Sequence, residues 1–170
     1  MIVYHGSFMP VEFPDVLHSR KDVDFGAGFY VTSIRSQADN WAKKFIRKDK
    51  DAFVSSYNFD NNVLNELSVL KFDSYSEEWL NFILNARSGN DTSSFDVVIG
   101  GVANDKVYNT LELFFDDLIT KSEALGRLKY EKPNNQICFR SQKAIDLCLT
   151  YIKSECVNSC LLYTSDAADE

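Results

Sequence analysis

Long apolar stretches are absent from this chain of 170 residues. No run approaches the roughly 18 consecutive apolar residues of a membrane-spanning helix, which argues against that class of protein. Residues 1–6 have neither the basic part nor the apolar part of a signal peptide. We therefore expect a cytoplasmic protein without a membrane segment.

Cysteine and histidine are scarce, and this limits the metal and nucleophile chemistry that the chain can support. The four cysteines all lie in the last quarter of the sequence: Cys138, Cys148, Cys156 and Cys160. They include no C-x-x-C pair, so we expect no zinc site and instead reduced, partly buried thiols. Only His5 and His18 are available for chemistry that needs a histidine.

Basic residues are fewer than acidic ones, giving a net charge of −7. This balance argues against non-specific binding of nucleic acid through a broad basic face. A cluster of cations at residues 43–50 has the spacing of a solvated helix face. With 45% hydrophobic and 14% aromatic residues, the chain is typical of a folded domain with a sizeable core.

The local pattern predicts strands and helices in an irregular order. Expected strands cover residues 2–4, 29–32, 52–59, 96–100 and 136–140, and residues 63–70 fit either a helical turn or a strand. Expected helices cover residues 34–48, 76–87, 104–118 and 121–128, and a last amphipathic helix after residue 141 includes Tyr151 and Ile152. This order lacks the alternation of a doubly wound parallel sheet, so the predicted fold class is α+β.

Serine and threonine side chains mark the expected helix starts. Their oxygens accept hydrogen bonds from the free N–H groups of the first turn. The predicted N-caps are Ser33, Ser76, Thr120 or Ser122, and Ser141.

Residues 160–170 differ in character from the rest of the chain. Their sequence, CLLYTSDAADE, matches one translated frame of a common sequencing adapter throughout. We therefore expect a single domain over residues 1–159 and an adapter-derived tail over residues 160–170. On this interpretation, neither the native C-terminus nor a native residue 160 can be read from the sequence.

A glycine-rich segment, residues 24–32 (DFGAGFYVT), joins a loop to a strand. Glycine admits positive φ angles and lets other groups approach the backbone, because it has no Cβ. One interpretation is a tight turn into a strand whose Tyr30 and Val31 pack in the core. The other is a bend that delivers the ring of Tyr30 to the wall of a pocket.

Four separated segments together have an unusual form. His5-Gly6-Ser7 ends the first strand, the glycine-rich segment follows, and a helix with Ala38, Trp41 and Ala42 comes next. Asn135-Gln136 opens a strand near the other end of the chain. This combination resembles the NAD-binding half of the ADP-ribosyltransferase superfamily, in the branch of diphtheria toxin and the poly-ADP-ribose polymerases. The resemblance implies an ADP-ribosyltransferase-like fold, with split mixed or antiparallel sheets flanked by helices.

A second resemblance covers residues 2–153. Besides the opening YHGS and the segment DFGAGFY, the chain has VIGGVAND at residues 98–105 and YEKPNNQ at residues 130–136. These motifs resemble DUF3990, a bacterial family without an assigned function that is grouped with the ADP-ribosyltransferases. The two resemblances agree.

The resemblance implies roles for residues of the first two segments, with NAD⁺ as co-substrate and no metal. The backbone of Gly6 would hold the nicotinamide carboxamide, and His5 would hydrogen-bond a ribose hydroxyl. Tyr30 would stack on the nicotinamide ring.

The same segments supply further cofactor-binding candidates. Ser7 and Gly28 lie beside the principal residues. Arg20 lies in the intervening loop, where it is either a bidentate ligand of the pyrophosphate or a surface arginine.

Gln136 departs from the pattern of the polymerases and toxins, which have glutamate at this position. Glutamine makes the hydrogen bond to the ribose but supplies neither negative charge nor a general base. This puts polymer synthesis in doubt and favours transfer of a single ADP-ribose. Glu131 is the nearest acid, either a source of charge or an exposed loop residue. On this hypothesis, Tyr30 faces a pocket shared with His5 and Gln136.

The expected function is an NAD-dependent mono-ADP-ribosyltransferase, acting as a bacterial intracellular toxin, effector or conflict-system component. The acceptor is unknown, and the acidic net charge favours protein over nucleic acid. A cognate antitoxin is an expectation from the resemblance. Two alternatives stay open: a catalytically inactive domain that binds NAD or ADP-ribose, and an NAD glycohydrolase in which water replaces the acceptor.

Overall fold

The computed structural model describes residues 1–20, 23–102, 105–131 and 134–157. The adapter-like tail, residues 160–170, lies outside the described residues, as do Lys132 and Pro133 of the YEKPNNQ motif.

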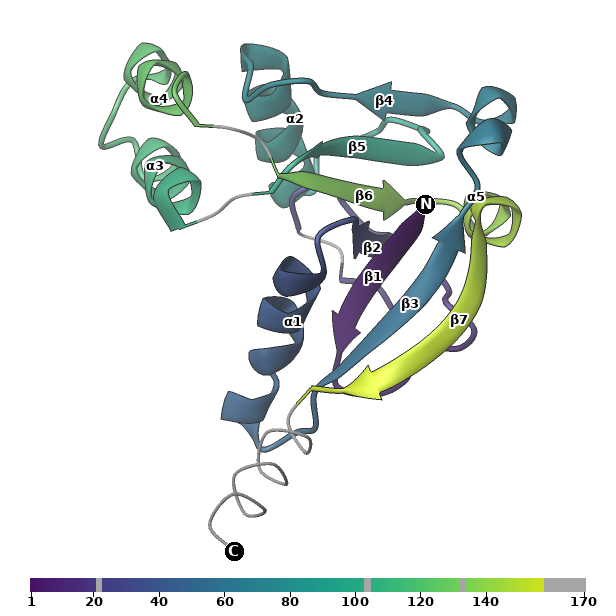
Figure 1. The fold of residues 1–170 in the computed structure, drawn as a ribbon. Coiled ribbons are helices and arrows are strands. Elements are labelled where there is room, and N and C mark those ends of the chain that lie inside the picture. Colours follow the sequence, from purple (N-terminus) through teal and green to yellow (C-terminus); the bar gives the residue numbers. More distant parts are fainter. Residues whose placement is uncertain (21–22, 103–104, 132–133, 158–170) are drawn as a thin grey trace, which may run out of the picture.

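Seven strands form one mixed sheet in the order β4-β5-β6-β2-β1-β3-β7 (Figure 1). The strands are β1 (Ile2–Ser7), β2 (Phe29–Thr32), β3 (Phe53–Phe59), β4 (Val69–Lys71), β5 (Val97–Gly101), β6 (Asn135–Phe139) and β7 (Leu149–Cys156). Among the described residues, β4 and β5 pair in parallel and the other neighbouring strands pair antiparallel. The α+β class is confirmed.

Helices flank both faces of the sheet. They are α1 (Arg35–Lys43), α2 (Glu77–Arg87), α3 (Asp105–Phe115), α4 (Lys121–Leu128) and α5 (Gln142–Cys148), with 3₁₀ turns at Ile46–Lys48 and Asn61–Glu66. Figure 1 shows α1 beside β1, and α3 and α4 next to each other beyond α2. In the described part of the chain, none of these helices is long and apolar enough to cross a membrane.

The predicted split into separate sheets is wrong, because one hydrogen-bonded sheet includes all seven strands. The two ends of the sheet nevertheless cross at a large angle, with β4, β5 and β6 at one end and β3 and β7 at the other (Figure 1). They are joined through β1 and β2, whose ladder has a single pair of partners, Tyr4 opposite Thr32. This narrow junction positions the candidate site.

The predicted last helix is wrong in its second half. Helix α5 ends at Cys148, and Leu149 already begins β7, so Tyr151 and Ile152 lie in a strand. The β-branched and aromatic residues of this segment suit a strand, and the free edge of β3 offers partners from Phe59 to Phe53. Long-range pairing thus outweighs the helical spacing.

Three of the predicted caps are confirmed. Ser76, Thr120 and Ser141 each accept a hydrogen bond from the N–H three residues later. The prediction for Ser33 is wrong, because Ile34 occupies the N-cap of α1 without a side-chain hydrogen bond. The N–H of Ile34 instead donates to Oγ1 of Thr32 over 3.1 Å.

Alternation along the strands separates two apolar layers. Val98, Cys138 and the half-buried Tyr30 face the layer under α2, α3 and α4. Val3, Phe29, Val31 and their neighbours form the opposite layer, which α5 and the loop after β1 cover. A smaller cluster joins Ala38 and Ala42 of α1 to Val54 of β3 and, at its edge, Tyr4.

Candidate functional site

The backbone hydrogen bonds of β1 alternate between its two neighbours. The amino group of Met1 lies 3.3 Å from the carbonyl oxygen of Phe59, and Phe59 N–H donates to Met1 O over 2.7 Å. Alternate residues of an antiparallel strand direct their N–H and C=O to opposite sides. His5 therefore directs its backbone groups to β3, opposite Ser55, whereas Tyr4 and Gly6 direct theirs to β2.

The ladder between β1 and β2 is interrupted at Gly6. Among the described residues it has one pair, Tyr4 opposite Thr32. In the same register, the next pair whose backbone N–H and C=O groups face each other would be Gly6 opposite Tyr30. The Tyr30 carbonyl, however, accepts a hydrogen bond from Nδ1 of His5 over 2.6 Å. We call this place the ladder opening: the Gly6 backbone, the His5 ring and the Tyr30 carbonyl.

One ring nitrogen of His5, Nε2, has no hydrogen-bond partner among the described residues. Because a carbonyl can only accept, Nδ1 of His5 carries the proton in its bond to Tyr30. Burial lowers the pKa of His5, and the hydrogen bond to Tyr30 offsets part of that effect. The ring is therefore neutral near pH 7, and its Nε2, to which no described residue bonds, is an acceptor.

The neighbour of His5 in space is an aromatic ring. His5 stacks on Phe29 with ring centroids 4.3 Å apart and an interplanar angle of 30°. The ring plane is thus held on one side by Phe29 and at its edge by the Tyr30 carbonyl, so the direction of Nε2 is fixed.

Gly6 is also required for packing. A Cβ at this position would overlap the carbonyl oxygen of Ala38 and lie 2.8 Å from Ala42 N. The same Cβ would lie 3.1 Å from Cβ of Trp41, which places the Trp41 side chain next to Gly6. The pattern of small residues around one tryptophan is visible in the sequence, but it does not by itself indicate a role for Trp41.

Trp41 is half-buried, and no apolar cluster or ring pair of the described residues includes it. Its indole is a flat apolar ring attached to a Cβ that lies next to the backbone of Gly6.

The side chain of Tyr30 hydrogen-bonds to the backbone of the glycine-rich turn. Its hydroxyl donates to the carbonyl of Gly26 over 2.5 Å and accepts from Phe25 N–H over 3.1 Å. Its ring lies 6.5 Å from that of Phe25, nearly parallel at 16°. Gly26 has a φ of 78°, which suits glycine alone. The tight turn with a packed Tyr30 agrees with the first interpretation, and the predicted stacking of Tyr30 on nicotinamide stays a prediction.

Gly28 is explained by the approach of β2 to β6. A Cβ here would lie 2.5 Å from Sγ of Cys138 and 2.7 Å from the carbonyl oxygen of Phe139. The structure therefore gives Gly28 a packing role, and its predicted cofactor role stays a prediction.

The contrast between Gly28 and Gly126 makes a test of this packing. We expect Gly28→Ala to lower the free energy of unfolding by about 1–3 kcal/mol, because the methyl group overpacks the β2–β6 contact. Gly126 lies within α4, and a Cβ there would meet nothing within 4 Å. Gly126→Ala should raise the free energy by about 0.5–1 kcal/mol, because alanine favours helix. Urea unfolding of both variants measures the two effects, and equal behaviour would contradict the packing assignment.

Two ion pairs hold the glycine-rich turn in place. Arg87 of α2 donates to Asp24 through Nε and Nη2, at 2.9 and 2.5 Å. Arg140, just after β6, donates to Asp91 over 2.7 Å, and both side chains are nearly buried, at 13% and 12% exposure. Gly26 lies against this second pair. Both pairs join residues far apart in sequence, so spacing could not reveal them.

Gln136 lies in the sheet between Thr32 of β2 and Gly100 of β5. Its side chain is 4% exposed, and its Nε2 is buried without a hydrogen bond to any described atom. A buried amide N–H of this kind lacks the acceptor that such groups normally have.

The prediction that the side chains of His5, Tyr30 and Gln136 share one pocket is wrong, because the strands place them on two different faces. Directly opposed residues share a face, so the Tyr30 and Thr32 side chains lie on the face of Gln136 and Cys138. His5 follows Tyr4 in β1 and therefore points to the opposite face, where Phe29 lies. His5 meets Tyr30 through the Tyr30 carbonyl instead.

Two other candidates lie apart from the ladder opening. Ser7 is 7% exposed and its hydroxyl donates to the carbonyl of Met9, which holds the loop after β1. Arg20 is exposed and bonds to no described residue.

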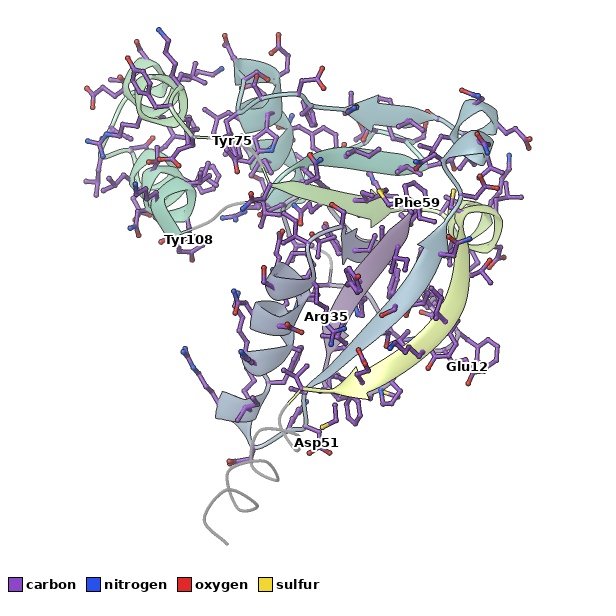
Figure 2. The ribbon with its side chains drawn as sticks, in the orientation of Figure 1. Glu12, Arg35, Asp51, Phe59, Tyr75 and Tyr108 are labelled. Carbon is purple, nitrogen blue, oxygen red and sulfur yellow. The ribbon has the colours of Figure 1, made fainter. Side chains whose placement is uncertain are left out.

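Glu131 lines a cavity of about 430 Å³ between the start of α2 and α4, together with Tyr75. Figure 2 shows Tyr75 beside α2 and Arg35 beside α1, well separated. Arg35 lies 5.6 Å from the centre of the Tyr4 ring, so its position marks that part of β1. The cavity at Tyr75 is therefore remote from that part of β1. A second cavity, of about 500 Å³, lies at Arg140 and Asp91. Neither cavity is lined by His5, Gly6, Tyr30 or Gln136.

In the described part of the chain, no three His, Cys, Asp or Glu side chains group closely enough to hold a metal ion. Cys138 and Cys148 are free, buried thiols.

One family model, described as "Protein of unknown function (DUF3990)", matches residues 1–151. Searches of curated proteins and of solved structures gave no match.

Proposed function

Since this chain belongs to the DUF3990 family, whose description assigns no function, we propose a function from its ladder opening: NAD⁺-dependent mono-ADP-ribosyl transfer. The observation that carries the proposal is the backbone of Gly6, whose N–H and C=O both face β2 where the ladder has ended. The neutral ring of His5 borders the same place.

A primary carboxamide complements such an opening. Like a strand residue, it carries a C=O acceptor and an N–H donor in one plane, so it pairs with Gly6 as one more rung of the ladder. The nicotinamide end of NAD⁺ carries this group. The ring attached to it would lie beside Trp41, whose indole offers a stacking surface. In this proposal Trp41 joins Tyr30 as an aromatic wall of the site.

Bond cleavage places positive charge on the ribose. The bond from ribose C1′ to the nicotinamide nitrogen breaks, its electron pair leaves with neutral nicotinamide, and the acceptor's lone pair forms the new bond at C1′. The acceptor loses its proton to solvent. His5 Nε2 accepts a hydrogen bond from one ribose hydroxyl on the Phe29 face, and the Gln136 amide bonds another on the α1 face, so in this proposal the sugar lies in the ladder opening between the two faces. Both interactions orient the sugar.

The lack of negative charge at Gln136 affects whether one ADP-ribose or a polymer is transferred. Glutamine cannot deprotonate an acceptor hydroxyl, and Glu131 lines a cavity that does not include Gln136. The site therefore favours a nucleophilic acceptor side chain and a single transfer over polymer growth. A role as a bacterial toxin or effector, with a cognate antitoxin and a protein acceptor, belongs to the same proposal.

Labelled NAD⁺ distinguishes the proposal from its two alternatives. The purified protein, incubated with a bacterial lysate and NAD⁺ labelled in the adenylate, should transfer label to an acceptor and release one nicotinamide per label. Nicotinamide release without labelled acceptor would support the glycohydrolase instead. NAD⁺ binding without nicotinamide release would support the inactive binder.

A further inference from the structure

Thr32 joins helix α1 to the strand that carries Gln136. The side chain is fully buried, and its Oγ1 accepts from Ile34 N–H over 3.1 Å. The single hydroxyl proton has two acceptors in reach, Oε1 of Gln37 at 3.0 Å and the carbonyl of Asn135 at 3.2 Å. One hydroxyl thus connects the start of α1 with the residue preceding Gln136.

This bond orients the amide of Gln37. Because the Thr32 hydroxyl donates, Gln37 presents its oxygen to Thr32 and turns its NH₂ group away. That NH₂ group bonds to no described residue, and the side chain is half-buried, so its donors remain available to a bound molecule.

Gln37 and Gln136 meet the same threonine. Thr32 is the ladder partner of Gln136, and the Cβ atoms of directly opposed residues lie about 4.5–5.5 Å apart on one face. Gln136 also has a buried amide nitrogen without an acceptor. Two uncharged amide side chains therefore lie beside one threonine, on the α1 side of the sheet.

We propose that Gln37 is a second ribose-contacting residue, held by Thr32 beside Gln136, and that the two amides together donate to oxygens of the ribose of NAD⁺. The inference rests on the proposed function, since it names part of the same site. A pair of neutral donors matches hydroxyl and ether oxygens, which are acceptors without charge. Nicotinamide alone has no ribose, so it should not depend on Gln37.

Calorimetry with NAD⁺ and with free nicotinamide tests the inference. Gln37→Ala should raise the Kd for NAD⁺ about 3- to 10-fold, the effect of one neutral hydrogen bond, and leave the Kd for nicotinamide unchanged. Asn40→Ala is the matched control, because it removes an exposed amide from the same helix. It should alter neither value. Thr32→Val should weaken NAD⁺ binding similarly, Thr32→Ser should preserve it, and Gln37→Ala should add little in the Thr32→Val background.

Equal weakening of both ligands in Gln37→Ala would overturn the inference, because it would show a general structural role. An unchanged Kd for NAD⁺ in that variant would overturn it as well and leave the proposed function standing. Failure of the wild-type protein to bind NAD⁺ would instead reject the proposed function and the inference together.

Discussion

His5→Ala is expected to reduce transfer of ADP-ribose at least about 100-fold, since the orientation of the ribose depends on this ring. The variant removes the Nε2 acceptor and the Nδ1 bond to the Tyr30 carbonyl together. It also removes the ring that stacks on Phe29. The assay is the labelling of an acceptor by NAD⁺.

Two comparisons separate this loss from misfolding. His5→Asn keeps a donor near Nδ1 that can reach the Tyr30 carbonyl but lacks Nε2, so it should fold well and still lose most activity. His18→Ala removes an exposed histidine whose side chain, among the described residues, pairs with Asp15, and it should retain full activity. Full activity of a folded His5→Asn variant would show that Nε2 has no part in the reaction.

Arg140→Leu is expected to lower the free energy of unfolding by about 3–5 kcal/mol, the cost of leaving a buried charge unpaired. Arg140 and Asp91 are 13% and 12% exposed, so little water is available to Asp91 once its partner is lost. Burial on its own would raise the pKa of Asp91, but hydrogen bonds from Ser93 and the charge of Arg140 outweigh it and hold that pKa below its usual range.

Urea unfolding measures the loss of stability in Arg140→Leu, and a second substitution tests whether the unpaired charge of Asp91 causes it. Arg140→Leu combined with Asp91→Asn should recover much of the stability, because no unpaired charge then remains. Lys153→Leu is the control, since it breaks an exposed ion pair with Glu155 and should change stability by less than about 1 kcal/mol. A loss below about 1 kcal/mol in Arg140→Leu would contradict the assignment of this pair as a support of the glycine-rich turn.

Local chemistry made much of the fold predictable. Ser76, Thr120 and Ser141 were recognisable as caps because a cap depends on a side chain and the turn beside it. The helix–strand order and the α+β class followed from hydrophobic spacing. Tyr151 and Ile152 were misassigned to a helix because only the distant edge of β3 decides their conformation.

The site was predictable as residue types but not as geometry. His5, Gly6 and Tyr30 do meet at one ladder, yet strand alternation sends the His5 side chain to the face opposite Tyr30 and Gln136. The need for glycine at positions 6 and 28 comes from packing: a Cβ there would meet Ala38 and Cys138, respectively. These contacts join distant segments, so the sequence alone does not reveal them. Trp41 and Gln37 needed the position of α1 against the sheet before they could be recognised.

The central claim is that the Gly6 backbone pairs with a carboxamide, and glycine-selective NMR tests it most directly. The chain has seven glycines, and Gly6 alone follows a histidine, so ¹⁵N-glycine with ¹³C-carbonyl histidine labelling identifies its amide signal. On addition of nicotinamide, that signal should move downfield and its hydrogen exchange should slow, while Gly126 stays unchanged. A Gly6 signal that does not respond at saturating nicotinamide would contradict the account.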